Sequence, residues 1–147
     1  MQKSLEEIVG KKYVQTGDDM AKWRVDWTKS YTADPMAVLR PANTDEVSRI
    51  LALAYQTGTP VVPLGGNTGL TGGTSGTGML MISLDRLNSI LELDGSGRTI
   101  TVEAGVILSK MQDAASRGGS VLLNSFEPFR EWVSRSVMPP LGLVTTG

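Results

Sequence analysis

The sequence predicts an α/β fold of the α+β kind, with a small mixed sheet and strand-helix-strand units. Two observations support this. An apolar helical stripe lies between two short strands over residues 38–64, most simply as a right-handed parallel crossover. Two further strands, 89–94 and 98–102, flank Gly95-Ser96-Gly97, which is typical of a β-hairpin. At 147 residues, 40% of them hydrophobic, the chain suffices for one domain.

The helix inside the first unit carries clear start and stop signals. Asn43 is the expected N-cap, with Glu46 three residues later as its reciprocal partner. Gly58 is the expected C-terminal cap. Between them runs one apolar stripe at helical spacing, made of Val47, Ile50, Leu51 and Ala54.

Three further elements complete the expected order. A short helical face is expected to end at Gly10, a buried strand covers residues 79–83, and a second long helix covers 107–117. The last helix should place Leu108, Met111 and Ala115 on one face. Trp23 and Trp27 are expected to pack an N-terminal arm against the body. The resulting division is an arm over 1–30, a subdomain over 31–118 and a divergent or truncated tail over 119–147.

Composition excludes several classes of function. The chain contains neither cysteine nor histidine, which excludes disulfides, thiolate metal sites and a Ser-His-Asp triad within it. Its net charge is −1 and it has no basic run, so a nucleic-acid surface is not expected. No apolar stretch approaches the ~20 residues of a membrane span. The N-terminus lacks the apolar segment of a secretory signal, so we expect a cytoplasmic protein.

The most informative segment is a glycine-rich loop that follows the second strand. Five of the nine residues from Gly65 to Gly73 are glycine, and each adds to the backbone entropy lost on folding. Bare N–H groups in such a loop can surround a phosphate. The segment has neither the lysine of a P-loop nor the strand-to-helix position of a Rossmann fingerprint. Possible side-chain donors are Asn67, Thr68, Thr71, Thr74 and Ser75. The alternative is a flexible surface loop between two strands.

We expect several other polar residues to have structural roles. Asp85 and Arg86 follow a buried strand and indicate a turn with a surface ion pair. Glu103 is expected to be a satisfied loop carboxylate. Arg40 is expected to extend along the surface or pair with Asp45, with ligand contact as the second choice. We assign no catalytic residue and no metal ligand.

The order of these motifs resembles the FAD-linked oxidases. The resemblance is to the p-cresol methylhydroxylase/vanillyl-alcohol oxidase type of FAD-binding domain. Within that family it is strongest to the D-2-hydroxyacid dehydrogenases, which include D-lactate dehydrogenase, the glycolate oxidase flavin subunit and D-2-hydroxyglutarate dehydrogenase. It extends over roughly residues 20–118 and is carried by Arg40-Pro41, Asp45-Glu46-Val47, Pro60 to Gly73, Ile82 to Asn88 and Val102 to Gly105.

The resemblance implies that the glycine loop binds the FAD diphosphate through backbone amides. The implied contacts are Gly65, Gly66, Asn67, Thr68 and Gly69, with Gly72 and Gly73 in the same pocket and Pro63 and Leu64 entering it. It also implies a fold in which this segment is the first of two subdomains around FAD. Relatives that tether flavin use histidine or cysteine, so FAD held by these residues would be non-covalent.

The resemblance weakens after the last predicted helix. A second glycine-rich block is expected there, but Pro139-Pro140 stand where a glycine pair would be expected. The tail is therefore either divergent or the product of a frameshift. We expect an N-terminal fragment that is inactive alone, from an enzyme whose full-length form oxidises a small 2-hydroxy acid. The alternatives are a non-catalytic nucleotide- or protein-binding remnant, and a sugar oxidase of the same superfamily.

Overall fold

The computed structural model describes residues 1–118, so the tail predicted over 119–147 lies outside the described residues. The described chain forms two compact units, which are treated separately. The first contains residues 1–89 and 103–106, and the second contains residues 90–102 and 107–118.

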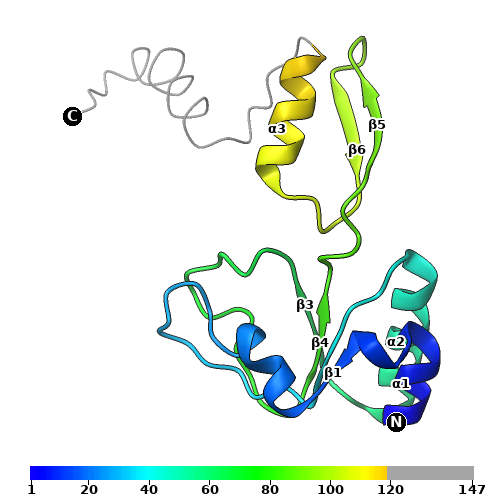
Figure 1. The fold of residues 1–147 in the computed structure, drawn as a ribbon, viewed down its shortest axis with the longest axis vertical. Helices are drawn as coiled ribbons and strands as arrows, with labels where there is room; N and C mark the ends of the chain where they lie inside the picture. The colour runs from blue at the N-terminus through cyan, green and yellow to red at the C-terminus, as the bar shows by residue number, and fades with distance from the viewer. Residues whose placement is uncertain (119–147) are drawn as a thin grey trace. The chain divides into compact units, whose positions relative to one another are not determined.

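The first unit is built on a four-stranded mixed sheet in the order β1-β2-β4-β3 (Figure 1). Its strands are β1 (Val14–Gln15), β2 (Ala37–Leu39), β3 (Val61–Leu64) and β4 (Leu80–Ser83). Strands β2 and β3 both run parallel to β4, and β1 is antiparallel to β2. The predicted mixed sheet is confirmed, with β4 lying between the two strands of the first strand-helix-strand unit.

Both faces of this sheet are covered, as expected for parallel strands. Side chains alternate between the faces with the period of two that a strand imposes. One face packs against α1 (Gln2–Val9) and α2 (Thr44–Thr57), and the other against the 3₁₀ helix η2 (Gly17–Trp23). Figure 1 shows α1 and α2 on one side of the sheet and η2 on the other. A short 3₁₀ turn, η1 (Lys11–Tyr13), connects α1 to β1.

Each face has its own apolar cluster. The cluster under α1 and α2 contains Leu5, Val9, Ala37, Leu39, Ile50, Ala54, Leu80 and Ile82. The cluster on the η2 side contains Met20, Trp23, Ala33, Val38, Leu64, Met79 and Met81. Leu64 is the last residue of β3 and belongs to the second cluster, so its burial fixes the position at which the glycine-rich segment starts.

Helix α2 has the caps that the sequence predicts. Asn43 Oδ1 accepts from Glu46 N at 2.9 Å, and Gly58 has the left-handed φ of 64°. The Glu46 carboxylate accepts from Ala42 N at 2.7 Å, one residue before the cap. The predicted stripe is wrong at Leu51, which is 46% exposed. Because α1 and the sheet cover the side of α2 that carries Ile50, Leu53 and Ala54, Leu51 is left outside.

Two predictions for local structure within residues 1–30 are confirmed. Helix α1 ends before Gly10, whose φ is 86°, and Trp23 is buried in the second cluster. The predicted anchoring role of Trp27 is wrong, because this side chain is 72% exposed. It lies in a tight turn between Asp26 and Tyr31, in which Asp26 N donates to Tyr31 O at 3.2 Å.

The second unit contains the predicted hairpin, with β5 (Ile90–Asp94) antiparallel to β6 (Thr99–Val102). Helix α3 (Leu108–Arg117) contacts β5. Its predicted apolar face is wrong at Leu108, which is exposed, because the buried side of α3 is centred on Ala114 and Ala115. Among the described residues, no helix is long and apolar enough to cross a membrane.

Candidate functional site

The glycine-rich loop leaves the sheet at the carboxyl end of β3. Since β2, β3 and β4 are parallel, their carboxyl ends share one edge, where ligands bind in open α/β sheets. The ladder between β3 and β4 ends with Leu84 N donating to Leu64 O at 2.9 Å. The loop therefore starts at Gly65, where strand pairing stops.

The backbone amides of this loop are free of protein partners. Across the described part of the chain, we find no hydrogen bond donated by a backbone N–H between Gly65 and Gly73. The next bonded amide along the loop is that of Ser75, which donates to Gly72 O at 2.9 Å. Gly65, Gly66, Thr68 and Gly69 are all exposed. A run of exposed, unpaired N–H donors is the feature that anion-binding backbone nests share.

The glycines of the loop divide into two kinds. At Gly72 the fold itself requires glycine, because φ is 69° and a Cβ would stand 2.7 Å from Cδ1 of Tyr31. At Gly65, Gly69 and Gly73 an added Cβ would meet nothing within 4 Å, and at Gly66 it would meet only Thr68 Cγ2 at 3.7 Å. None of these four has a positive φ. Packing gives no reason for glycine there, whereas close approach of a ligand to bare backbone does.

Side chains from the loop hold its shape. Asn67 adopts a left-handed φ of 53°, and its Nδ2 donates to Val25 O at 3.2 Å. Thr74 Oγ1 donates to Asn67 Oδ1 at 2.9 Å. The Thr74 hydroxyl and one N–H of the Asn67 amide are thus used within the protein. Thr68 and Thr71, which were also predicted as donors, are exposed.

The two residues that precede the loop lie differently. Pro63 is exposed on β3, whereas the Leu64 side chain is buried in the η2-side cluster. The structure therefore places the start of the glycine loop at the carboxyl edge of the sheet, and it directs the Leu64 side chain away from solvent.

The basic residues at this edge are engaged by the protein. Arg40 pairs with Asp85, with Nη2 2.9 Å from Oδ2, so the predicted partner Asp45 is wrong. Parallel pairing of β2 and β4 brings the residues after both strands to the same edge, which explains the choice of Asp85. Arg86 Nη1 donates to Arg40 O at 2.7 Å, and its guanidinium carbon lies 3.5 Å from the centre of the Tyr13 ring. An anion at the loop would therefore rely on backbone dipoles.

Two carboxylates of the first unit have structural partners. Glu103 Oε2 accepts from Ser89 N at 2.7 Å, as the sequence predicts for a satisfied loop carboxylate. Asp26 is buried, with 7% of its surface exposed. Hydrogen bonds from the Thr28 hydroxyl and then from Tyr31 N lower the pKa of the Asp26 carboxyl.

The turn around Asp26 is the part of the site that sequence reasoning missed. Through Val25 O and the Tyr31 ring it contacts Asn67 and Gly72 of the glycine loop. The available signal was the Asp26-Trp27-Thr28 pattern, because Asp and Thr side chains at this spacing favour a tight turn.

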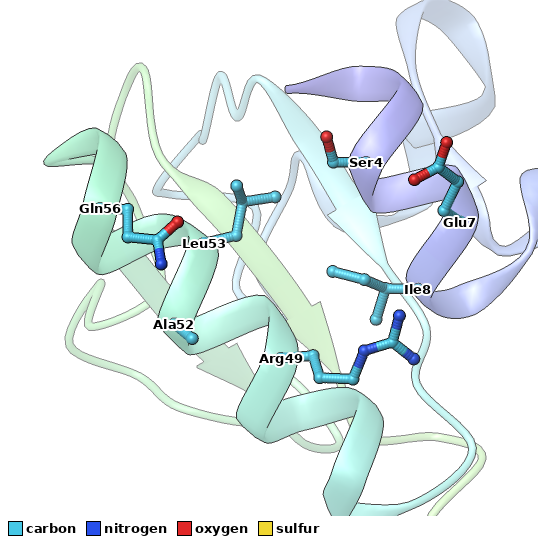
Figure 2. Close-up of a pocket in the computed structure, with 7 residues that line it drawn as sticks. All are labelled: Ser4, Glu7, Ile8, Arg49, Ala52, Leu53 and Gln56. Carbon is cyan, nitrogen blue, oxygen red and sulfur yellow. The ribbon is translucent and has the colours of Figure 1, made fainter.

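A separate groove lies between α1 and α2 (Figure 2) and contains none of the predicted site residues. It has a volume of about 290 Å³ and is lined by Ser4, Glu7, Ile8, Arg49, Ala52, Leu53 and Gln56. Figure 2 shows Ile8 and Leu53 directed toward each other between the helices, with Arg49 extending toward α1. Within residues 1–118, no group of three or more His, Cys, Asp or Glu side chains could hold a metal ion.

Comparison with known proteins gives a consistent family. Residues 35–128 match the FAD binding domain family. The chain is 38% identical over 104 residues to a D-2-hydroxyglutarate dehydrogenase of Xanthomonas citri pv. viticola, covering 70% of this chain and 22% of the relative. It is 43% identical over 95 residues to the glycolate oxidase subunit GlcD of Bacillus subtilis, covering 64% and 20%.

The fold is also that of a solved structure. A crystal structure of p-cresol methylhydroxylase with substrate bound superposes with a TM-score of 0.68 at 17% identity, covering 80% of this chain and 24% of that one. The alignments to the two curated relatives cover 22% and 20% of those proteins, so the chain spans about a fifth of their length.

Proposed function

Because this chain belongs to the FAD binding domain family of FAD-linked oxidoreductases, whose cofactor is FAD, we propose that it is the N-terminal FAD-binding part of an enzyme that oxidises a D-2-hydroxy acid. Two curated relatives, a D-2-hydroxyglutarate dehydrogenase and a glycolate oxidase subunit, support this substrate class. Bound flavin supplies the acceptor for the hydride that such an acid loses.

The observation that supports this function most is the run of unpaired amides from Gly65 to Gly73. We assign the FAD diphosphate to the backbone of Gly65, Gly66, Asn67, Thr68 and Gly69, with Gly72 and Gly73 beside it and Pro63 and Leu64 at the entrance. The four glycines without a packing role allow the phosphates to approach the backbone closely. Since Arg40 and Arg86 are held by Asp85 and Arg40 O, the amide dipoles provide the attraction.

Two further parts of the proposal concern how FAD is held and whether the chain is active alone. With no histidine or cysteine in the chain, FAD is held non-covalently, and the chain alone, which spans about a fifth of its curated relatives, turns over no substrate. The division at residues 31 and 118 and a cytoplasmic location stay predictions.

A pair of glycine substitutions tests the cofactor site. Gly69→Ala adds a methyl group where the protein itself leaves open space, so the variant should fold like the parent. We expect its affinity for FAD and for ADP to fall by about tenfold, as for the loss of one strong hydrogen bond to a charged group. Gly95→Ala is the matched control, because its Cβ would meet only Gly118 O at 3.8 Å. Equal affinities in all three proteins would reject the assignment of the diphosphate to this loop.

The substrate class needs its own assay. The full-length product of the gene is tested for reduction of dichlorophenolindophenol with D-2-hydroxyglutarate, glycolate and D-lactate, and with glucose as the contrast. Reduction by a hydroxy acid alone supports the proposal. Reduction by glucose alone indicates a sugar oxidase, and a protein that takes up no flavin indicates a non-catalytic remnant.

A further inference from the structure

We propose that residues 25–31 form a strap that positions the glycine loop for the cofactor, and that Asp26 is the residue that holds this strap in shape. The inference rests on the proposed function of the loop. It assigns Asp26 as a positioning residue that acts through Val25 and Tyr31 and does not itself touch FAD.

The Asp26 carboxylate organises the strap from inside. Oδ1 accepts from Tyr31 N at 3.0 Å, and Oδ2 accepts from Thr28 N at 3.1 Å and from the Thr28 hydroxyl. The Asp26 backbone closes the same turn, since its N–H donates to Tyr31 O and its carbonyl accepts from Lys29 N at 3.1 Å. A buried carboxylate with three donors is a stable centre for a turn that has no apolar core of its own.

The strap contacts the loop at two places. Val25 O accepts from Asn67 Nδ2 at 3.2 Å, and the Tyr31 ring lies against Gly72, where an added Cβ would be 2.7 Å from Cδ1 and 2.9 Å from Cγ. Both loop residues have a positive φ, 53° at Asn67 and 69° at Gly72. A backbone in this region persists when its surroundings hold it. Asn67, a non-glycine residue in this region, is therefore a position that needs support, and the strap contacts it directly.

The next segment extends this support along the loop. Asp34 N donates to Gly76 O at 2.8 Å, and Gly78 N donates to Asp34 O at 3.0 Å. The chain from 25 to 34 thus runs beside the loop and ties it at Asn67, Gly72 and Gly76 to Gly78, but leaves the amides between Gly65 and Gly73 unbonded. A preorganised anion site requires this arrangement, because donors that are already ordered lose less conformational entropy when the ligand binds.

Asp26→Asn in the 147-residue chain tests the inference. It removes the charge and replaces one acceptor oxygen by a donor that faces Thr28 N or Tyr31 N. Asp45→Asn is the matched control, since it removes an exposed charge from α2, which packs on the other face of the sheet from the η2-side cluster. Two readouts are needed: the NMR shifts of Gly72, which the Tyr31 ring displaces without any ligand, and the dissociation constant for FAD below the unfolding temperature.

We expect Asp26→Asn to abolish the ring-induced shift at Gly72. We also expect it to weaken FAD binding about tenfold, the effect of losing one hydrogen bond to a charged group. Asp45→Asn should change neither readout. A folded Asp26→Asn protein that keeps the Gly72 shift overturns the inference, as does one that loses the shift and keeps its FAD affinity. If the parent protein binds no FAD or ADP, the proposed function fails instead, and the strap is judged by the Gly72 shift alone.

A second set of variants applies if Asp26→Asn does not fold. Gly72→Ala should weaken FAD binding partly because its Cβ collides with the Tyr31 ring. In a Tyr31→Ala background that collision is absent, so the added cost of Gly72→Ala should be smaller. An equal cost in both backgrounds would show that Tyr31 does not position Gly72.

Discussion

Arg40 and Asp85 lie 45 positions apart in the sequence and form a bidentate ion pair. Arg40 Nε is 3.1 Å from Oδ1 and 3.0 Å from Oδ2 of Asp85, and Nη2 is 2.9 Å from Oδ2. The two residues follow β2 and β4 at their carboxyl ends, so the pair ties neighbouring strands together at the edge where the glycine loop begins.

Asp85→Ala should lower the free energy of unfolding by about 1 kcal/mol, at the upper end for partly exposed ion pairs, because the geometry is bidentate and Arg40 keeps access to water. Urea unfolding at low salt measures this loss. The difference between the two proteins should shrink in 1 M NaCl, where the Debye length is about 3 Å. An Asp85→Ala protein as stable as the parent at low salt would show that the pair contributes nothing.

Asn43→Ala should cost about 1 kcal/mol of stability, because it removes the side-chain acceptor for Glu46 N at the start of α2. Asn43→Asp retains an acceptor at the cap and is the matched control, with stability close to that of the parent. Thermal and urea unfolding of the three proteins measure the effect. Equal losses for the two variants would contradict a capping role.

Gly105→Ala should destabilise the first unit by about 1–3 kcal/mol or more, as for overpacking. A Cβ there would overlap the Leu84 carbonyl and stand 2.8 Å from Leu87 O, and both are backbone atoms that cannot rotate away. Gly95→Ala again serves as control, since its added methyl group meets open surroundings. Chemical unfolding compares them, and an unchanged midpoint for Gly105→Ala would contradict the described contact.

Local signals predicted much of this fold, and long-range contacts explain the errors. The cap at Asn43, the left-handed Gly58 and the hairpin turn at residues 95–97 depend on neighbouring residues, so the sequence sufficed. Leu51 and Trp27 were predicted as packed, but which side of an element is covered depends on partners distant in sequence.

The site follows the same rule. The high glycine content alone indicated the loop that begins at Gly65, because an exposed backbone site is visible in the sequence as a cluster of glycines. The partner of Arg40 could not be predicted, since β4 had first to be placed beside β2. The strap was missed for the same reason: Val25 and Asn67 are 42 positions apart, and neither residue signals the other.

The strap also predicts a pH dependence. In the native state, hydrogen bonds from Thr28 and Tyr31 lower the pKa of the Asp26 carboxyl. Ionised Asp26 therefore stabilises the fold above the unfolded pKa of about 4, and this stabilisation is lost as the pH falls through the native pKa. The charged residues that flank it in the sequence are Lys29 and Arg24, which pairs with Asp34. Unfolding followed from pH 7 to 2 should show a steeper loss for the parent than for Asp26→Asn. Parallel curves would contradict an ionised Asp26 in the strap.

The most direct test of the account is an amide-resolved NMR titration of the chain with ADP, with adenosine as the ligand that lacks phosphates. If the bare amides bind a diphosphate, ADP will move the resonances between Gly65 and Gly73 more than any others, and adenosine will leave them in place. If ADP leaves these amides unmoved, or if ADP and adenosine move them alike, the loop is not a diphosphate site and the central claim is wrong.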